Sequence, residues 1–145
     1  MKTSRGFTLI ELIVVMAVLA VLVGATALLG MRTVNVQEFE RVRETARNEL
    51  VAARSDTIAG SNDSAWGVKF NANSAVRFKG NTYASRVSAY DRTTSFGNTV
   101  TISGTSEVDF TRPFGAPSAS ATIILSDGSR TATMTVNTIG TIQIQ

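Results

Sequence analysis

An apolar stretch near the N-terminus limits the folds that are open to this chain of 145 residues. Residues 7–31 contain a single ionisable side chain, that of Glu11. As an α-helix the stretch would be about 37 Å long, which is enough to cross the apolar core of a bilayer. A cleaved secretory signal peptide is the alternative, because residues 24–27 are small, but its apolar core is usually only about 7–15 residues long. We therefore expect residues 7–31 to form a transmembrane helix.

The charges in and around this stretch predict an orientation and a partner. Lys2 and Arg5 precede it, so the N-terminus should be cytoplasmic and residues 32–145 should lie on the other side of the membrane. Glu11 is costly in lipid unless it reaches the interface or meets a positive group. A cut between Gly6 and Phe7 in a neighbouring subunit would create such a group, the new α-amino group.

The sequence KTSRGFTLIELIVVMAVLAVL at residues 2–22 resembles the class III signal of type IV pilins and type II secretion pseudopilins. The resemblance implies that residues 1–6 are a leader peptide and that residues 7–31 form the filament-core helix. It implies that a prepilin peptidase cleaves after Gly6 and methylates the amine of Phe7. It also implies that Glu11 pairs with the N-terminal amine of a neighbouring subunit. Either charge alone would be costly in an apolar environment, but the pair would be tolerated there.

The same resemblance implies where the chain resides and what it meets. It would be a single-pass protein of the inner (cytoplasmic) membrane, with its head in the periplasm or outside the cell, and would join a pilus or pseudopilus after assembly. Its partners would be membrane lipid before assembly, the prepilin peptidase, an inner-membrane assembly platform and other pilin or pseudopilin subunits.

Residues 32–59 show the pattern of an amphipathic helix that continues the stem. Apolar residues recur every three or four positions, while charged residues occupy the other faces. The apolar positions are Phe39, Val42, Ala46, Leu50 and Ala53. No proline precedes Pro113, so one helix over residues 7–59 is allowed, and the turn-forming residues 60–64 should end it.

Residues 60–145 change to the two-residue period of strands and predict a globular β-rich head. A hairpin is expected around residues 71–74, with Val76 and Phe78 facing inward and Arg77 and Lys79 facing outward. Further strands are expected at 99–103, 107–111, 121–126, 131–136 and 141–144, and residues 81–98 should be a loop with at most one short strand. The predicted fold class is α+β, a long N-terminal helix packed on an antiparallel sheet.

The head also resembles the C-terminal pattern of GspH/FimT-type pseudopilins. The matching segments are 108–115, 121–128 and 132–140, together with Glu49–Ser55 on the helix. The chain lacks the proline near Leu28 and the cysteine pair of many major pilins. The resemblance therefore implies a minor pilin or pseudopilin, with a major pilin as the alternative.

An enzyme is not expected, because histidine and cysteine are absent from the sequence. Glu107 and Asp109 share one face of a predicted strand, which would suit a carboxylate pair or a divalent ion, but two solvated charges are the favoured interpretation. No metal and no cofactor are proposed.

A second function class remains open, a pilus subunit that binds DNA or another ligand for uptake or adhesion. Lys69, Arg77 and Lys79 alternate with aromatic residues, as in proteins that bind single-stranded nucleic acid. Aromatic side chains packed in a core, with basic side chains in water, are the commoner explanation. The end of the chain also lacks the arginines that the resemblance associates with DNA capture.

Overall fold

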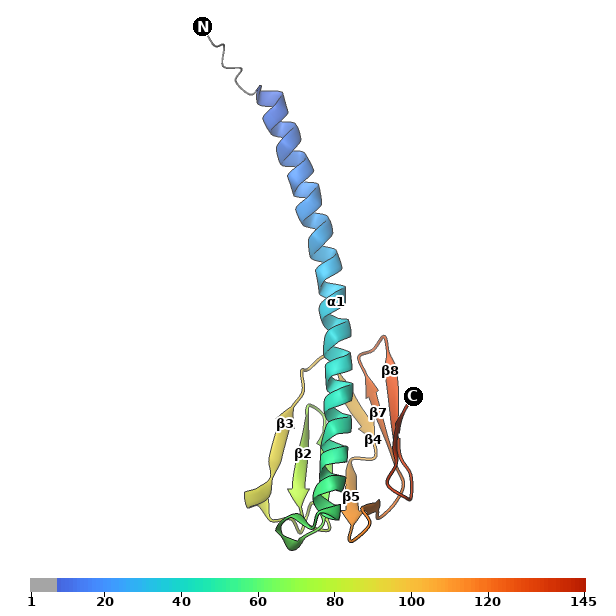
Figure 1. Cartoon of the computed structure of the whole chain (residues 1–145). Helices are drawn as coiled ribbons and strands as arrows, with labels where there is room; N and C mark the ends of the chain where they lie inside the picture. The colour runs from blue at the N-terminus through green and yellow to red at the C-terminus, as the bar shows by residue number, and fades with distance from the viewer. Residues whose placement is uncertain (1–7) are drawn as a thin grey trace. The chain divides into compact units, whose positions relative to one another are not determined.

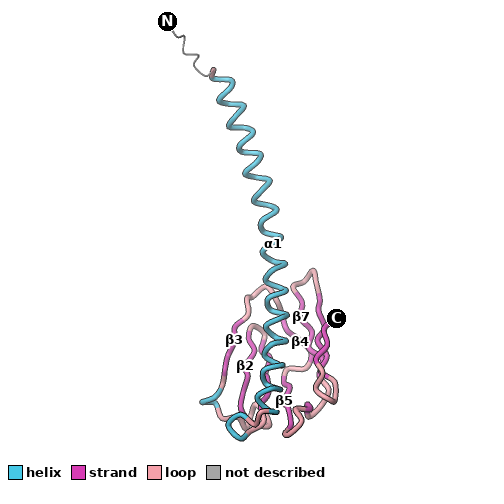
Figure 2. The backbone as a smooth tube through the Cα atoms, in the orientation of Figure 1, coloured by secondary structure: helices cyan, strands magenta, loops and turns pink. Residues whose placement is uncertain are grey.

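The computed structural model describes residues 8–145, with the side chains of residues 8–24 and 36–145. Helix α1 (Leu9–Ile58) is followed by the short 3-10 helix η1 (Ser61–Asp63) and by antiparallel sheets (Figures 1 and 2). The predicted α+β fold class is confirmed. The strands are β1 (Trp66–Asn71), β2 (Ser74–Lys79), β3 (Arg92–Ser95), β4 (Thr101–Gly104), β5 (Glu107–Thr111), β6 (Ala116–Pro117), β7 (Ala121–Ser126), β8 (Thr131–Val136) and β9 (Ile142–Ile144), and the 3-10 helix η2 (Ser88–Tyr90) precedes β3.

The chain divides into two compact units, residues 1–37 and residues 38–145. In the first unit, the large apolar side chains from Leu9 to Val23 are all at least half exposed. Over residues 8–24 and 36–145, no helix is apolar over a length that would cross a membrane.

The second unit has one core, in which the last turns of α1 lie against both sheets (Figure 1). The predicted apolar stripe of the helix is buried, as expected from its 3.6-residue period. It packs against side chains from β1, β5, β7 and β8. Buried members of this core include Phe39, Val42, Ala46, Leu50, Ala53, Val68, Val108, Phe110, Ile123, Leu125 and Met134.

Helix α1 ends at Ile58, just before the turn-forming residues 60–64 that were expected to end it. Gly60 has a φ of 64°, the left-handed conformation that favours glycine after the last helical turn. The amide of Gly60 donates to the carbonyl of Thr57, and the amide of Ala59 donates to the carbonyl of Ser55. The chain then turns back into β1.

The five-stranded sheet has the order β3-β2-β1-β5-β6. Its β1–β2 hairpin is confirmed, with Asn71 paired to Ser74 across the turn. The face that carries Val68 and Phe70 packs on α1, and the opposite face carries Val76 and Phe78. Tyr83 covers that second face and packs edge-on against Phe78, with ring centroids 5.5 Å apart. Both faces of this sheet are therefore covered. The sequence of residues 81–98 did not indicate that this segment would cover the second face.

The four-stranded sheet has the order β4-β7-β8-β9. Strands β7 and β8 match the predicted ranges, and β9 forms the edge. Backbone amides of Ser129 and Arg130 donate to the carboxylate of Asp127, and these hydrogen bonds hold the turn between β7 and β8 and lower the pKa of the carboxyl. The short strand β6 was not predicted, because Ala116–Pro117 has no alternation to detect.

Thr57 ties the end of α1 to the first strand. It is fully buried, and its hydroxyl donates to the carbonyl of Ala53 and accepts from the amide of Trp66, each at 2.9 Å. Thr57→Val keeps the shape but leaves the Trp66 amide without a partner, so we expect a loss of about 1–3 kcal/mol in the free energy of unfolding. Urea denaturation measures this loss. Thr57→Ser keeps the hydroxyl and should cost less, and equal losses would contradict the hydrogen-bond explanation.

Candidate functional site

The first predicted site, at the start of the chain, consists of Gly6, Phe7 and Glu11. The structure describes the chain from residue 8 onward and so includes only Glu11 of these three. Gly6 and Phe7 lie outside the described residues, as does the rest of the leader. Thr8 is the N-cap of α1, because the amide of Glu11 donates to the Thr8 hydroxyl at 3.4 Å and to its carbonyl at 3.1 Å. Glu11 thus lies in the first turn of the helix, and it is exposed.

This position is electrostatically favourable for a carboxylate. The N-terminal end of a helix carries a partial positive charge, which stabilises an acidic side chain in the first turn. Thr8 and Glu11 also have the spacing of a capping box, in which a threonine is followed three residues later by a glutamate. In the sequence, Glu11 is four positions after Phe7, the residue that follows the predicted cleavage point.

The second predicted site, formed by Lys69, Arg77 and Lys79, is divided by the fold. Lys69 pairs directly with Val76 across the hairpin, so it lies on the face opposite Arg77. The expectation that Arg77 faces outward is wrong. Its side chain is 12% exposed and points at α1, where it contacts Asp56 at 2.9 Å and Glu49 at 3.4 Å.

The two lysines also have partners. Lys69 Nζ lies 3.7 Å from Glu107 Oε2 and 3.1 Å from the Ser106 hydroxyl. Lys79 Nζ lies over the ring of Tyr90, 4.6 Å from its centroid. The fold therefore brings no basic patch together from these three residues, and their ligand role stays an untested prediction.

The carboxylates of β5 are placed on one face, as their spacing indicated. Lys69 is directly opposite Glu107, and Gly67 is directly opposite Asp109. Glu107 is already engaged, because its Oε1 accepts from the amide of Tyr83 at 2.7 Å. Among the residues described here, no group of three or more metal-binding side chains is found.

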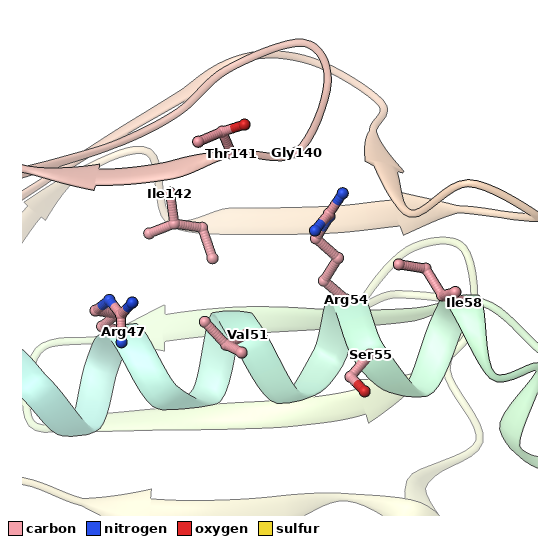
Figure 3. A pocket seen from close by; sticks show the side chains of 8 residues that line it. All are labelled: Arg47, Val51, Arg54, Ser55, Ile58, Gly140, Thr141 and Ile142. Carbon is pink, nitrogen blue, oxygen red and sulfur yellow. The ribbon is translucent and has the colours of Figure 1, made fainter.

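A groove that the sequence did not indicate lies between α1 and the segment joining β8 to β9 (Figure 3). Its cavity is about 380 Å³. The helix and the β9 side each contribute one wall. The lining residues are Arg47, Val51, Arg54, Ser55, Ile58, Gly140, Thr141 and Ile142.

The guanidinium of Arg54, which lines this groove, is held in place by two hydrogen bonds to backbone carbonyls. Its Nε donates to the carbonyl of Gly115 at 3.0 Å, and its Nη2 donates to the carbonyl of Ile139 at 3.4 Å. Gly140 has a φ of 82°, and a Cβ there would come within 2.6 Å of Arg54 Nε. Glycine at this turn thus allows the guanidinium to lie against the backbone of the β8–β9 segment. The spacing of Arg47, Val51, Arg54 and Ile58 on one helical face was the available sequence signal.

Comparison with family models gives one match. Residues 1–27 match the prokaryotic N-terminal methylation motif. Comparisons with curated proteins and with solved structures found no match. The matched range includes Gly6, Phe7 and Glu11 but none of the head, so the GspH/FimT resemblance of the head gains no support from it. Over its first 27 residues, the chain carries the N-terminal methylation motif that is the signature of type IV pilins and pseudopilins.

Proposed function

We propose that this chain is a minor pilin or pseudopilin, a non-enzymatic subunit that is cut after Gly6, methylated at Phe7 and assembled into a type IV pilus or type II secretion pseudopilus. The methylation motif over residues 1–27 is the observation that carries the proposal. The motif is characteristic of structural subunits that assemble with related chains after processing by a prepilin peptidase.

The start of α1 supports the proposed role of Glu11 as the partner of a neighbour's N-terminal amine. A cut after Gly6 leaves Phe7 as the first residue, with Thr8 as the helix cap and Glu11 in the first turn. The new ammonium group would then stand next to the partially positive end of the helix, which is unfavourable. A carboxylate from a neighbouring subunit offsets this repulsion, and Glu11 is the one acidic residue in residues 7–31 of the sequence.

Before assembly, residues 7–31 would anchor the chain in the inner membrane with the head outside the cytoplasm. The apolar side chains from Leu9 to Val23 are exposed in the single chain, which supports the proposal that lipid or other subunits cover them. In the filament, the same side chains would pack against the equivalent helices of neighbours, and Glu11 would set the register of each subunit.

The head supplies no observation in favour of a DNA-binding role through Lys69, Arg77 and Lys79, because Arg77 is paired with two carboxylates beneath α1. We therefore keep the assembly role as the single proposed function. A minor rather than a major role is proposed from the absence of cysteine and of a proline near Leu28 in the sequence.

Mass spectrometry of sheared filaments and of the membrane fraction tests the proposal. We expect an intact mass that corresponds to residues 7–145 with one added methyl group, present at a small fraction of the most abundant pilin in the filaments. A chain that retains residues 1–6 in both fractions would refute the processing. The processed chain as the most abundant filament protein would instead identify a major pilin.

A further inference from the structure

The free edge of β9 forms one wall of the groove between α1 and the β8–β9 segment. Thr133 and Gln145 exchange both backbone hydrogen bonds, and the amide of Asn137 donates to the carbonyl of Thr141. Paired residues in an antiparallel ladder alternate between bonded and non-bonded pairs. Ile142 and Ile144 occupy the non-bonded positions opposite Val136 and Met134, so their amides and carbonyls point away from β8, toward the open edge.

The side chains around this edge combine apolar surface with unpaired positive charge. Val51 and Ile58 are exposed by 42% and 50%, and the side chain of Ile142 points toward α1 (Figure 3). Within the part of the chain described with side chains, neither Arg47 nor Arg54 has a carboxylate within 4.0 Å. The two arginines lie seven residues apart, on the same face of the helix.

We propose that this groove binds an extended segment of another filament subunit, which adds to β9 as a further strand of the four-stranded sheet. Its backbone pairs with the amides and carbonyls of Ile142 and Ile144, as in recognition by strand addition. Two side chains of this segment, two residues apart, face the helix. One is an aspartate or glutamate that contacts Arg47 and Arg54. The other is apolar and covers Val51 and Ile58. The inference rests on the proposed function, because the partner is taken to be a subunit of the same filament.

The groove favours a protein segment over a nucleic acid. A phosphate backbone calls for a positive surface, whereas here exposed apolar side chains lie between and beside the two arginines. Arg54 also directs two of its donors to backbone carbonyls of the head itself, which leaves fewer of its N–H groups free to contact a phosphate backbone.

Photo-crosslinking in cells that assemble the filament tests the docking. A photoreactive residue replaces Ser55, which is exposed and lines the groove, and a control replaces Thr93, which is exposed on edge strand β3. The expected product joins position 55 to an extended segment of another pilin-like subunit, with an acidic and an apolar residue two positions apart. Peptide mapping by mass spectrometry identifies the segment, and position 93 should not capture it.

A charge reversal tests the role of the arginines. Arg47→Glu is expected to lower the yield of the crosslink by about tenfold, because like charges at an interface disfavour the complex. Arg92→Glu is the matched control, since Arg92 is also exposed and has no carboxylate partner among the described side chains. It should leave the yield unchanged.

Hydrogen exchange tests the addition of a strand. The captured segment, synthesised as a peptide and added to the purified full chain, should slow exchange at the amides of Ile142 and Ile144 by about tenfold or more. The amide of Gln145 already donates to Thr133, so it should change little.

The outcomes separate this inference from the proposed function. Capture of lipid or nucleic acid alone, equal capture at positions 55 and 93, or no response to Arg47→Glu would overturn the docking. Processed chain that enters filaments without any crosslink at position 55 would overturn the docking and leave the proposed function standing. A crosslink to the expected kind of segment in cells whose filaments lack the chain would support the docking and refute the filament role.

Discussion

Glu11→Ala is expected to reduce the amount of chain in sheared filaments by about tenfold or more, while its amount in the membrane stays the same. The reason is that removal of one member of a buried ion pair leaves the other charge uncompensated. In the assembled filament, the ammonium group of a neighbour's Phe7 would then remain among apolar helices without its carboxylate. Insertion into the membrane depends on the apolar stretch as a whole, and alanine makes that stretch more apolar.

Quantitative mass spectrometry of the filament and membrane fractions measures this effect. Glu44→Ala is the matched control, because Glu44 is another exposed carboxylate on α1 and its partner Arg43 also lies 2.7 Å from Glu40. Glu11→Gln separates charge from hydrogen bonding, since the amide retains an acceptor but no charge. Assembly of the Glu11→Ala chain at the normal level would rule out the proposed pairing.

The sequence predicted most elements of the fold, because buried positions recur along them with the period of a helix or of a strand. The helical stripe that includes Val42 and Leu50 is buried, and β5, β7 and β8 begin and end where the alternation predicted. The positive φ of Gly60 explains why the helix boundary was also predictable. In these segments local pattern and tertiary packing favour the same structure.

The surfaces of the head were less predictable, because strand alternation indicates two faces without indicating what covers each. Arg77 was expected in water, yet its face packs on α1, and the face with Phe78 is covered by Tyr83. The groove beside Arg54 depends on Gly115, Ile139 and Gly140, which lie 61 to 86 residues away in sequence. No local pattern reports a contact of that range.

The contacts of Arg77 show that this inward-facing charge is part of the head's structure. Its guanidinium lies between Asp56 and Glu49, at 2.9 and 3.4 Å, and the hydroxyl of Thr94 donates to the second oxygen of Glu49 at 2.7 Å. The side chains of Arg77 and Glu49 are only 12% and 16% exposed. The ion pairs therefore connect β2 to α1, and the Thr94 hydrogen bond connects β3 to α1, at a place where Arg77 and Glu49 are largely shielded from water.

Arg77→Met should lower the free energy of unfolding by about 3 kcal/mol, the lower end for loss of one member of a buried ion pair, because Asp56 retains part of its hydration. Urea denaturation of the purified full chain, followed by the fluorescence of its single tryptophan, Trp66, measures the loss. Arg92→Met is the matched control, because Arg92 lies directly opposite Arg77 on β3 and is exposed. It should cost no more than about 0.5 kcal/mol.

A second substitution shows whether the loss comes from charge or from packing. Glu49→Gln added to Arg77→Met removes one of the two uncompensated carboxylates, so the double variant should be more stable than Arg77→Met alone. If the loss came from packing of the arginine side chain, Glu49→Gln would bring no recovery. Equal stability of the Arg77→Met and Arg92→Met chains would show that the ion pairs beneath α1 do not hold the helix on the sheet.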